Sequence, residues 1–408
     1  MSHTIAMLSV HTSPLDSPGR TKDAGGMNVY IRELATELGR RGNSVDIFTR
    51  QTHERTPKIV QLAPNVRVIH IQAGPKTSLH KNSLFPYIPS FVAQVAKFAD
   101  REARTYDVLH SHYWLSGIAG VQLAWRWDIP HVTMFHTLAH LKQLAHPDEQ
   151  EPQERLDSEQ RLLQSVDCVI AATTEEQTQM MRYCGVPMNR VQVIPCGVDL
   201  DLFVPYPQQQ ARAHLGLDKH QPLVLFAGRL DPFKGPDVLI RAASMMEEKA
   251  QIVIVGGSLK EDKDLQNLRM LAAELNIEQR VQFLGAQPQH ILPYLYSAAD
   301  VTVVPSYHES FGLVAVESLA CGTPVVATRA GGLTTIVHND ENGYLVPRCP
   351  GFFAERLDAI VRTPEIKARL QREARRSVLQ FSWQSIATQM NDVYSDLVSV
   401  LKTAALPS

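Results

Sequence analysis

The sequence has 408 residues, a length that predicts about two or three domains. Hydrophobic residues make up 44% and charged residues 20%, as in ordinary soluble proteins, and the net charge of −2 argues against a nucleic acid or an anionic membrane as a partner. No apolar run approaches the ~20 residues of a membrane span, and the N-terminus lacks a basic stretch followed by an apolar signal core. We therefore expect a cytoplasmic protein.

Strands and helices are predicted to alternate along the first half of the chain. Short apolar runs predict strands at 4–11, 44–49, 66–72, 107–112, 131–136, 167–173 and 191–195. After the first of them, apolar residues recur at helical spacing from Ile31 to Leu38, and Gly42 ends that helix. Strand–helix alternation of this kind predicts a parallel sheet with helices on both faces.

The same alternation restarts after a stretch rich in proline and turn residues, 195–210, which is typical of a linker. Further strands are predicted at 222–228, 250–256, 281–285, 300–305 and 323–328. We infer an α/β protein of two Rossmann-like domains, about 1–195 and 200–380, that face each other across a cleft. A last helix, 383–403, with apolar residues at helical spacing from Trp383 onward, is predicted to cross back to the first domain.

The five cysteines are scattered and form no C-x-x-C pair, which predicts reduced thiols and no metal site. They are Cys168, Cys184, Cys196, Cys321 and Cys349.

Ligands of open α/β sheets bind beyond the carboxyl ends of the strands, so the segments that follow strands are the candidate sites. The stretch GRTKDAGGMNVY, 19–30, follows the first strand, and Gly25 and Gly26 let the backbone approach a ligand at a helix start. The stretch is not G-x-G-x-x-G, and no acidic residue ends the second strand. Both observations argue against a nicotinamide-dependent enzyme.

Two basic residues bracket a turn after the first strand of the second domain. In FAGRLDPFKGPDVLI, 226–240, Arg229 offers a planar fork and Lys234 a point charge, both suited to one diphosphate. The alternative is a pair of solvated loop cations.

Two glutamates flank a glycine turn in SYHESFGLVAVES, 306–318. The backbone amides at Gly312 and Leu313 begin a helix and suit a phosphate. Glu317 is placed to accept hydrogen bonds from ribose hydroxyls, and Glu309 from a sugar ring. A helix cap plus an exposed glutamate is the structural alternative.

A histidine, His136, stands at the carboxyl end of the predicted strand 131–136 and is a candidate proton carrier or hydrogen-bond donor near neutral pH. The chain has 16 histidines, and only the position at a strand end singles this one out.

These motifs resemble those of the retaining, nucleotide-sugar-dependent glycosyltransferases of family 4, and the resemblance covers nearly the whole chain. ESFGLVAVE fits that family's signature of two glutamates, and GRLDPFKG fits its diphosphate loop. The resemblance implies the GT-B fold of two Rossmann domains. It also implies that Glu309 holds the transferred sugar and Glu317 the ribose, while His136, Arg229, Lys234 and Glu309 serve catalysis. The implied donor site comprises Gly26, Arg229, Lys234, Gln287, Glu309, Ser310, Phe311, Gly312, Leu313 and Glu317.

Within the family, DAGGMNVY, HSHYWLSG and HTLAHLK are most similar to the inositol-phosphate glycosyltransferases of mycothiol synthesis. That similarity implies an acceptor site in which four residues bind a phosphate and two lie near the acceptor ring. The four are Lys81, Tyr113, Thr137 and Arg155, and the two are Gly26 and Asn28. Gln287 stands where these relatives have an arginine near the base, and His308 where they have an asparagine beside the sugar.

Short bacterial sucrose-phosphate synthases also belong to the family and also glycosylate a phosphorylated sugar. Glutamine-rich stretches such as 148–164 resemble proteins of photosynthetic bacteria, which make sucrose. On that ground we expect UDP-glucose as donor and fructose 6-phosphate as acceptor, with N-acetylglucosamine transfer to inositol phosphate as the alternative.

The resemblance implies a front-side transfer, in which a donor phosphate oxygen takes the acceptor's proton. A double displacement needs a carboxylate nucleophile, and none is evident in HVTMFHTLA, 131–139. Arg229 and Lys234 supply positive charge, so we expect no metal and no other cofactor. A sugar-nucleotide epimerase and a non-catalytic sugar-nucleotide sensor are the rival interpretations from other classes.

Overall fold

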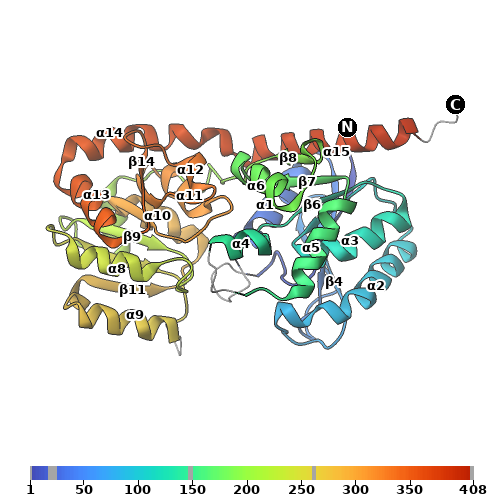
Figure 1. The fold of residues 1–408 in the computed structure, drawn as a ribbon, viewed down its shortest axis with the longest axis horizontal. Helices are drawn as coiled ribbons and strands as arrows, with labels where there is room; N and C mark the ends of the chain where they lie inside the picture. The colour runs from blue at the N-terminus through green and yellow to red at the C-terminus, as the bar shows by residue number, and fades with distance from the viewer. Residues whose placement is uncertain (1, 17–24, 146–149, 260–262, 405–408) are drawn as a thin grey trace. The chain divides into compact units, whose positions relative to one another are not determined.

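A computed structural model of the chain describes residues 2–16, 25–145, 150–259 and 263–404. The chain forms two compact units (Figure 1). The first holds the described residues up to Gly197 together with those from Trp383 onward, and the second runs from Val198 to Ser382. Residues 17–24, which include the first half of the predicted glycine-rich stretch 19–30, lie outside the described residues. Within the described ranges, no helix is long and apolar enough to cross a membrane.

The sheet of the first unit has eight strands among the described residues, in the order β3-β4-β2-β1-β5-β6-β7-β8. Its strands are β1 (Thr4–Ser9), β2 (Ser44–Arg50), β3 (Ile59–Ala63), β4 (Val66–Ile71), β5 (Val108–His112), β6 (His131–Met134), β7 (Cys168–Ala171) and β8 (Val191–Val193). The central strand β1 is buried from Ile5 to Leu8, as expected of a parallel strand that is covered on both faces.

The sheet is parallel, as predicted, except at one edge, where β3 pairs antiparallel with β4. Pro64 and Asn65 make the tight connection, and Asn65 adopts a φ of 62°, which asparagine tolerates better than most residues. The sequence did not predict β3, because every residue of this strand is at least partly exposed and the segment is not a continuous apolar run.

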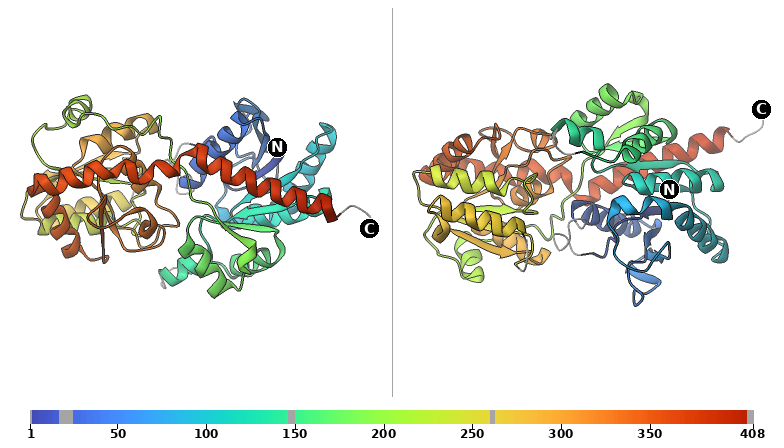
Figure 2. Two further views of the ribbon diagram at one scale, coloured as in Figure 1. Left: turned by 90° about the horizontal axis from the view of Figure 1, so that it is seen from above. Right: turned by 60° about the horizontal axis from the view of Figure 1, so that its bottom comes forward.

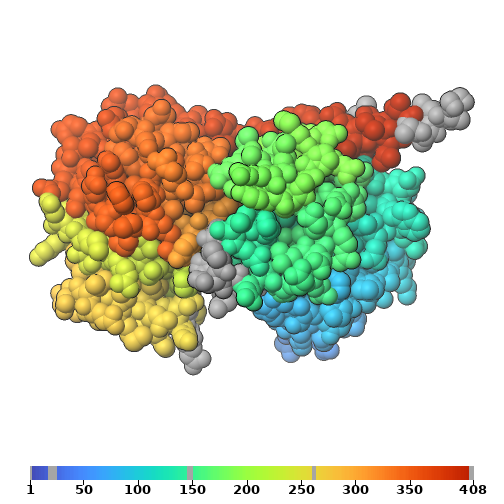
Figure 3. Space-filling view, viewed as in Figure 1, coloured from blue at the N-terminus to red at the C-terminus, as the bar shows by residue number. Residues whose placement is uncertain are grey.

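Helices cover both faces of this sheet. They are α1 (Gly26–Arg40), α2 (Ile88–Arg101), α3 (Trp114–Trp127), α4 (Ala139–Ala145), α5 (Gln153–Ser165), α6 (Thr174–Cys184) and α15 (Trp383–Ala404), with 3-10 turns η1 (Lys81–Ser83), η2 (Phe85–Tyr87) and η3 (Met188–Arg190). The core beneath α2, α3 and α5 includes the buried rings of Phe48, Phe91, Trp114 and Phe135. The space-filling view shows α4 to α6 as a green surface of this unit (Figure 3).

The C-terminal helix α15 packs against α1 and belongs to the first unit (Figure 2). Its buried face carries Trp383, Met390 and Tyr394. Hydrogen bonds also fix the helix, because Arg41 donates to the carbonyl oxygen of Gln384 at 2.7 Å. The end of the chain is therefore part of the framework that carries the first unit's strand ends.

The described sheet of the second unit is parallel throughout, in the order β11-β10-β9-β12-β13-β14. Its strands are β9 (Leu223–Ala227), β10 (Gln251–Val255), β11 (Val281–Gly285), β12 (Val301–Val304), β13 (Val325–Thr328) and β14 (Gly343–Val346). Two parallel α/β sheets confirm the predicted fold class, and all twelve predicted apolar runs form strands. The sequence did not predict β14, which is short and begins at a glycine.

The helices of the second unit also lie on both faces of its sheet. They are α7 (Gln208–Leu215), α8 (Pro236–Met245), α9 (Lys263–Glu274), α10 (Leu292–Ala298), α11 (Leu313–Ala320), α12 (Leu333–Ile336), α13 (Pro350–Arg362) and α14 (Pro364–Ala374), with 3-10 turns η4 (Glu278–Arg280), η5 (Gln289–Ile291) and η6 (Arg376–Phe381). The glutamines at the end of the predicted linker are the start of α7 rather than part of a loop.

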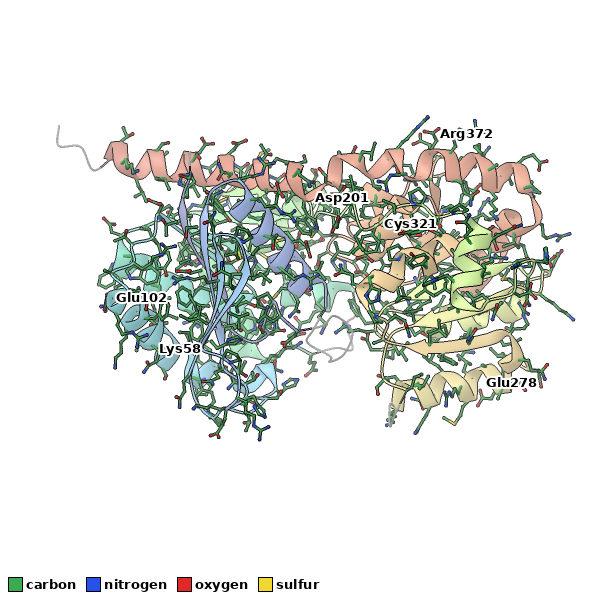
Figure 4. All side chains as sticks on the ribbon, turned by 180° about the vertical axis from the view of Figure 1, so that it is seen from behind. Lys58, Glu102, Asp201, Glu278, Cys321 and Arg372 are labelled. Carbon is green, nitrogen blue, oxygen red and sulfur yellow. The ribbon has the colours of Figure 1, made fainter. Side chains whose placement is uncertain are left out.

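Arg375 fixes the remaining linker to α11. Its guanidinium donates to the carbonyl oxygens of Leu200 at 2.9 Å, Phe203 at 2.6 Å and Ala320 at 2.6 Å. Ala320 is the last residue of α11 and precedes Cys321, which is labelled in Figure 4. The linker is therefore tied to the helix that carries Glu317.

Candidate active site

An ion pair joins two of the predicted site residues beyond the carboxyl ends of β9 and β12. Lys234 Nζ donates to Glu309 Oε1 at 2.7 Å and to Oε2 at 2.9 Å. Ser306 Oγ also donates to Oε1 at 2.7 Å. Burial by itself raises the pKa of the Glu309 carboxyl, but the Lys234 ammonium and these hydrogen bonds hold that pKa below its usual value. Glu309 is therefore a fixed, ionised acceptor at neutral pH.

The helix α11 begins four residues after Glu309, at Leu313, and points its N-terminus to the same strand end. Gly312 is its N-cap with a φ of 111°, a value that side chains rarely allow, and Phe311 before it is buried. The first amides of an α-helix, here from Leu313, have no partner within the helix and carry partial positive charge. Ser310 lies in the same turn. The arrangement suits an anion next to the Lys234–Glu309 pair.

Glu317 lies inside α11 and is almost fully buried. Tyr296 Oη donates to its Oε2 at 2.8 Å. Burial raises the pKa of Glu317 to about 7, and the bond from Tyr296 only partly offsets this rise. A ligand hydroxyl that donates to the same carboxyl favours its ionised form.

Arg229 and Gln287 lie in loops of the same strand end. Arg229 Nε pairs with Asp231 Oδ2 at 3.2 Å, and its side chain is 39% exposed, so it is the more accessible of the two predicted diphosphate cations. Gln287 follows β11 and donates from Nε2 to the carbonyl oxygen of Leu284 at 2.7 Å.

In the first unit, His136 lies two residues after the end of β6 and has a φ of 59°. Such a backbone is unusual for a residue other than glycine and is enriched at functional sites. Its Nε2 lies 3.1 Å from Nδ1 of His112, and the edge-on ring of Tyr30 lies 5.1 Å away between centroids. Burial lowers the pKa of His136 to about 3, with a further contribution from His11. The imidazole is therefore neutral at physiological pH.

Three of the predicted acceptor residues gather beside it. The Arg155 guanidinium lies 4.8 Å from the ring centroid of Tyr113 and donates to the carbonyl oxygen of Thr137 at 2.6 Å. Tyr113 is the N-cap of α3 with a φ of 74°, and burial raises the pKa of its hydroxyl to about 12. The Thr137 hydroxyl donates to the carbonyl oxygen of His136 at 2.7 Å.

Arg155 is only 2% exposed and already has two carboxylate partners. Its Nε donates to Glu159 at 2.7 Å and its Nη1 to Glu151 at 2.9 Å. Glu151 also accepts a hydrogen bond from Lys142 Nζ at 2.8 Å. The prediction treated Arg155 as a cation available to a phosphate, whereas here its charge is matched within the protein.

Two further predicted acceptor residues, Lys81 and Asn28, lie in two other segments of the first unit. Lys81 begins η1, close in sequence to Phe85, whose ring stacks on Trp114 at 5.9 Å next to Tyr113. Asn28 is buried in α1, and its Nδ2 donates to Thr12 Oγ1 at 2.7 Å and to the carbonyl oxygen of Ser13 at 2.6 Å. Its side chain therefore fixes the segment after β1, at the exposed helix start formed by Gly26.

Comparison with known proteins decides the family. A model described as Glycosyltransferase Family 4 matches residues 24–202, and one described as Glycosyl transferases group 1 matches residues 207–377. The D-inositol 3-phosphate glycosyltransferase of Xylanimonas cellulosilytica is 44% identical over 401 residues, which are 96% of each chain. The chain belongs to glycosyltransferase family 4. A second D-inositol 3-phosphate glycosyltransferase, from Corynebacterium efficiens, is 40% identical over 99% of this chain and 97% of its own.

Solved structures agree with this family 4 assignment. A sucrose-phosphate synthase from Thermosynechococcus elongatus superposes with a TM-score of 0.90 and 36% identity over 97% of this chain and 99% of its own. The Anabaena protein HepE in complex with UDP and glucose superposes with a TM-score of 0.78 at 24% identity, over 97% and 100% of the two chains, and supports the fold alone. The chain is thus a nucleotide-sugar-dependent retaining glycosyltransferase with the GT-B fold, as the sequence predicted.

Three glycines of this family 4 enzyme shape the strand ends but were missed in the sequence. A Cβ on Gly256 would lie 1.7 Å from the carbonyl oxygen of Gly228, so the loops after β9 and β10 meet backbone to backbone. A Cβ on Gly332 would lie 2.5 Å from Cα of Phe311, and one on Gly331 would lie 2.2 Å from the carbonyl oxygen of Glu309. Their signal was a glycine pair at or shortly after the end of a predicted strand, at 256–257 and at 331–332.

Arg348 is a fourth missed residue and ties the loops together. Its Nε donates to the carbonyl oxygen of Pro305 at 2.9 Å and its Nη2 to that of Pro232 at 3.1 Å. Its guanidinium also lies 3.5 Å from the ring centroid of Tyr307. Arg348 therefore joins the loop that carries Lys234 to the loop that carries Glu309. No sequence pattern indicated this role, because Arg348 follows a strand that was not predicted.

Proposed function

We propose that the enzyme transfers a sugar from a UDP-sugar to D-inositol 3-phosphate with retention at the anomeric carbon. The choice of acceptor rests on the similarity over nearly the whole chain, at 40% and 44% identity, to two proteins named D-inositol 3-phosphate glycosyltransferases. This replaces fructose 6-phosphate, which we expected from the sequence, as the first choice. UDP-N-acetylglucosamine is the donor that the resemblance implies for such an acceptor.

The second unit offers the groups that a UDP-sugar needs. A diphosphate at the start of α11 would meet helix amides together with Lys234 and Arg229, and charge that develops on the leaving UDP would be stabilised there. Glu309, oriented by Lys234, accepts hydrogen bonds from the transferred sugar, and Glu317 accepts them from the ribose. The two cations supply the positive charge, so we propose that turnover needs no metal and that a chelator leaves the rate unchanged.

The first unit offers a phosphate-binding cluster and a neutral histidine. Tyr113, Thr137 and Arg155 support binding of an acceptor phosphate, and Lys81 is the fourth donor that the resemblance implies. His136 donates a hydrogen bond and orients substrate rather than taking its proton, because its low pKa makes it a weak base. The donor's phosphate oxygen takes the acceptor's proton in this mechanism.

Fructose 6-phosphate is the second candidate acceptor. It is favoured by the superposition on the sucrose-phosphate synthase, with a TM-score of 0.90. Both acceptors carry a phosphate, so the cluster at Arg155 serves either one. Release of UDP that depends on D-inositol 3-phosphate supports the first candidate, and release that depends only on fructose 6-phosphate supports the second. An epimerase or a sensor releases no acceptor-dependent UDP.

A further inference from the structure

Behind His136 lies a group of buried rings to which the proposed transfer assigns no role. His110 and His112 lie two residues apart on β5, and their ring centroids are 4.3 Å apart. Nδ1 of His110 lies 2.7 Å from the hydroxyl of Tyr394 on α15, and Nδ1 of His112 lies 3.1 Å from Nε2 of His136. The C-terminal helix is thus linked to the residue at the strand end through two histidines whose rings are tilted by 42°.

Burial makes both rings of the His112–His136 pair neutral, because it lowers the pKa of each. Two neutral imidazoles at 3.1 Å share one proton along their hydrogen bond, so one ring donates and the other accepts. Either His112 donates from Nδ1, or His136 donates from Nε2.

The far side of His112 decides between these alternatives. Its Nε2 is buried and has no hydrogen-bond partner among the described residues. If His136 donated, the proton of His112 would sit on that Nε2 as an unpaired buried N–H, a group that folded proteins rarely leave unsatisfied. If His112 donates from Nδ1, Nε2 is a bare acceptor and no N–H is stranded. The geometry therefore favours His112 as the donor.

We propose that His112 is a positioning residue that fixes the tautomer of His136. With Nε2 of His136 accepting from His112, the proton of His136 resides on Nδ1, and any hydrogen bond from this ring to a substrate oxygen is donated by Nδ1–H. The inference deepens the proposed function and rests on it where catalysis is concerned. The tautomer itself does not depend on the identity of the substrate.

Kinetics of two His112 variants test the positioning role. His112→Phe keeps a ring of similar size but removes the donor, and His112→Asn places an amide N–H near the position of Nδ1. We expect kcat to fall by about 10-fold or more in His112→Phe with the acceptor KM changed less than ~3-fold, and to recover to within ~3-fold of the wild type in His112→Asn. A folded His112→Phe enzyme with wild-type kcat, or a folded His112→Asn enzyme as slow as His112→Phe, would overturn the role.

His131 supplies the matched control. It is as deeply buried on the neighbouring strand β6 and has a similarly low pKa of about 3, but its Nε2 bonds Ser111 Oγ at 2.7 Å. His131→Gln should lower the melting temperature and leave kcat unchanged. If His131→Gln lowered kcat as much as His112→Phe, loss of packing would explain both variants and the inference would fail.

Nitrogen-15 NMR of histidine-labelled, ligand-free enzyme tests the tautomer without any substrate. We expect a protonated Nδ1 and an unprotonated Nε2 for His136, with His136→Gln used to assign the signals. A protonated Nε2 would overturn the tautomer even if the acceptor is correct. The expected tautomer in an enzyme that glycosylates neither inositol nor sugar phosphates would instead refute the proposed function and leave the tautomer standing.

Discussion

Lys234 and Glu309 hold each other 2.7 Å apart across the ends of two strands, although the sequence placed one on a diphosphate and the other on a sugar. The pair stays near the surface, with side chains 23% and 17% exposed. An ion pair of this kind orients the carboxylate and leaves the third ammonium hydrogen able to donate to a ligand. We therefore expect the two residues to act as one unit in donor binding.

Replacement of either cation near the proposed diphosphate should lower turnover without unfolding the protein. Hydrogen bonds to charged groups contribute about 1.5–3 kcal/mol each, so Arg229→Ala and Lys234→Ala should each lower kcat/KM by roughly 10- to 100-fold. Lys234→Ala should cost more, because it also leaves Glu309 without its counter-charge. Arg241→Ala, at an exposed position of α8, is the control and should leave kcat/KM unchanged. Wild-type rates in both Arg229→Ala and Lys234→Ala would refute the diphosphate assignment.

The pH dependence of UDP binding should report Glu317. Its pKa in the folded enzyme is raised from 4.5 to about 7. Ribose hydroxyls donate best to the ionised carboxylate, because a proton on the Glu317 carboxyl competes with them. UDP affinity should therefore rise between pH 6 and pH 8 by up to about 10-fold, as measured by calorimetry. Glu317→Gln should abolish the rise. Glu309→Gln should keep it, because Glu309 has a lowered pKa and stays ionised over this range.

The raised pKa of Glu317 also has a consequence for stability. A carboxyl whose pKa is higher in the folded than in the unfolded state contributes stability below the unfolded value, and this contribution is lost as pH rises through the folded value. The loss from Glu317 therefore falls between pH 4.5 and about 7. Chemical unfolding of Glu317→Gln should show a smaller decrease in free energy over this window than the wild type. An identical decrease would contradict the buried, protonated state of Glu317.

Glu151 should compete with the acceptor phosphate. Its carboxylate accepts hydrogen bonds from both Lys142 and Arg155, so a phosphate bound at Arg155, as proposed, would compete with it. Glu151→Gln removes the competing charge, so the KM of the phosphorylated acceptor should fall by about 3- to 10-fold, while that of the UDP-sugar stays constant. Asp157→Asn, an exposed substitution on the same helix α5, is the control. An acceptor KM that rises in Glu151→Gln would show that the carboxylate supports the cluster instead.

A methyl group on Gly332 should disturb the proposed sugar site. Its Cβ would lie 2.5 Å from backbone atoms of Phe311, so the turn that carries Glu309 must shift. We expect Gly332→Ala to lower kcat by about 10-fold or more, since a small displacement of a positioning group is costly. Gly351→Ala is the matched control, because its Cβ meets nothing within 4 Å. Equal activity of both variants would show that Glu309 need not be held in this position.

The sequence predicted the fold well because buried parallel strands are continuous apolar runs, such as 250–256 and 300–305. It missed β3, whose residues are all partly exposed, and β14, which is short and starts at Gly343. These strands are recognisable only by the partner with which each one pairs. Periodicity within a single segment does not contain that information.

The candidate site was predictable where a residue follows a strand, as for Lys234, Glu309 and His136. Interactions between separate segments were not. Arg155 was expected to be available to a phosphate, but folding buries it between Glu151 and Glu159, a pairing that the four-residue spacing on both sides could have suggested. The bond from His112 to His136 required the register of β5 and β6.

The identity of the acceptor distinguishes the proposed activity from transfer to fructose 6-phosphate. One competition assay determines that acceptor. The purified enzyme is given UDP-N-acetylglucosamine and UDP-glucose with D-inositol 3-phosphate, free inositol, fructose 6-phosphate and free fructose, and products are identified by mass spectrometry. We predict a glycosylated inositol phosphate and UDP, with free inositol at least ~10³-fold slower because it cannot form the charge-assisted hydrogen bonds that a phosphate forms. Sucrose phosphate as the sole product, or equal rates with free inositol, would contradict this prediction.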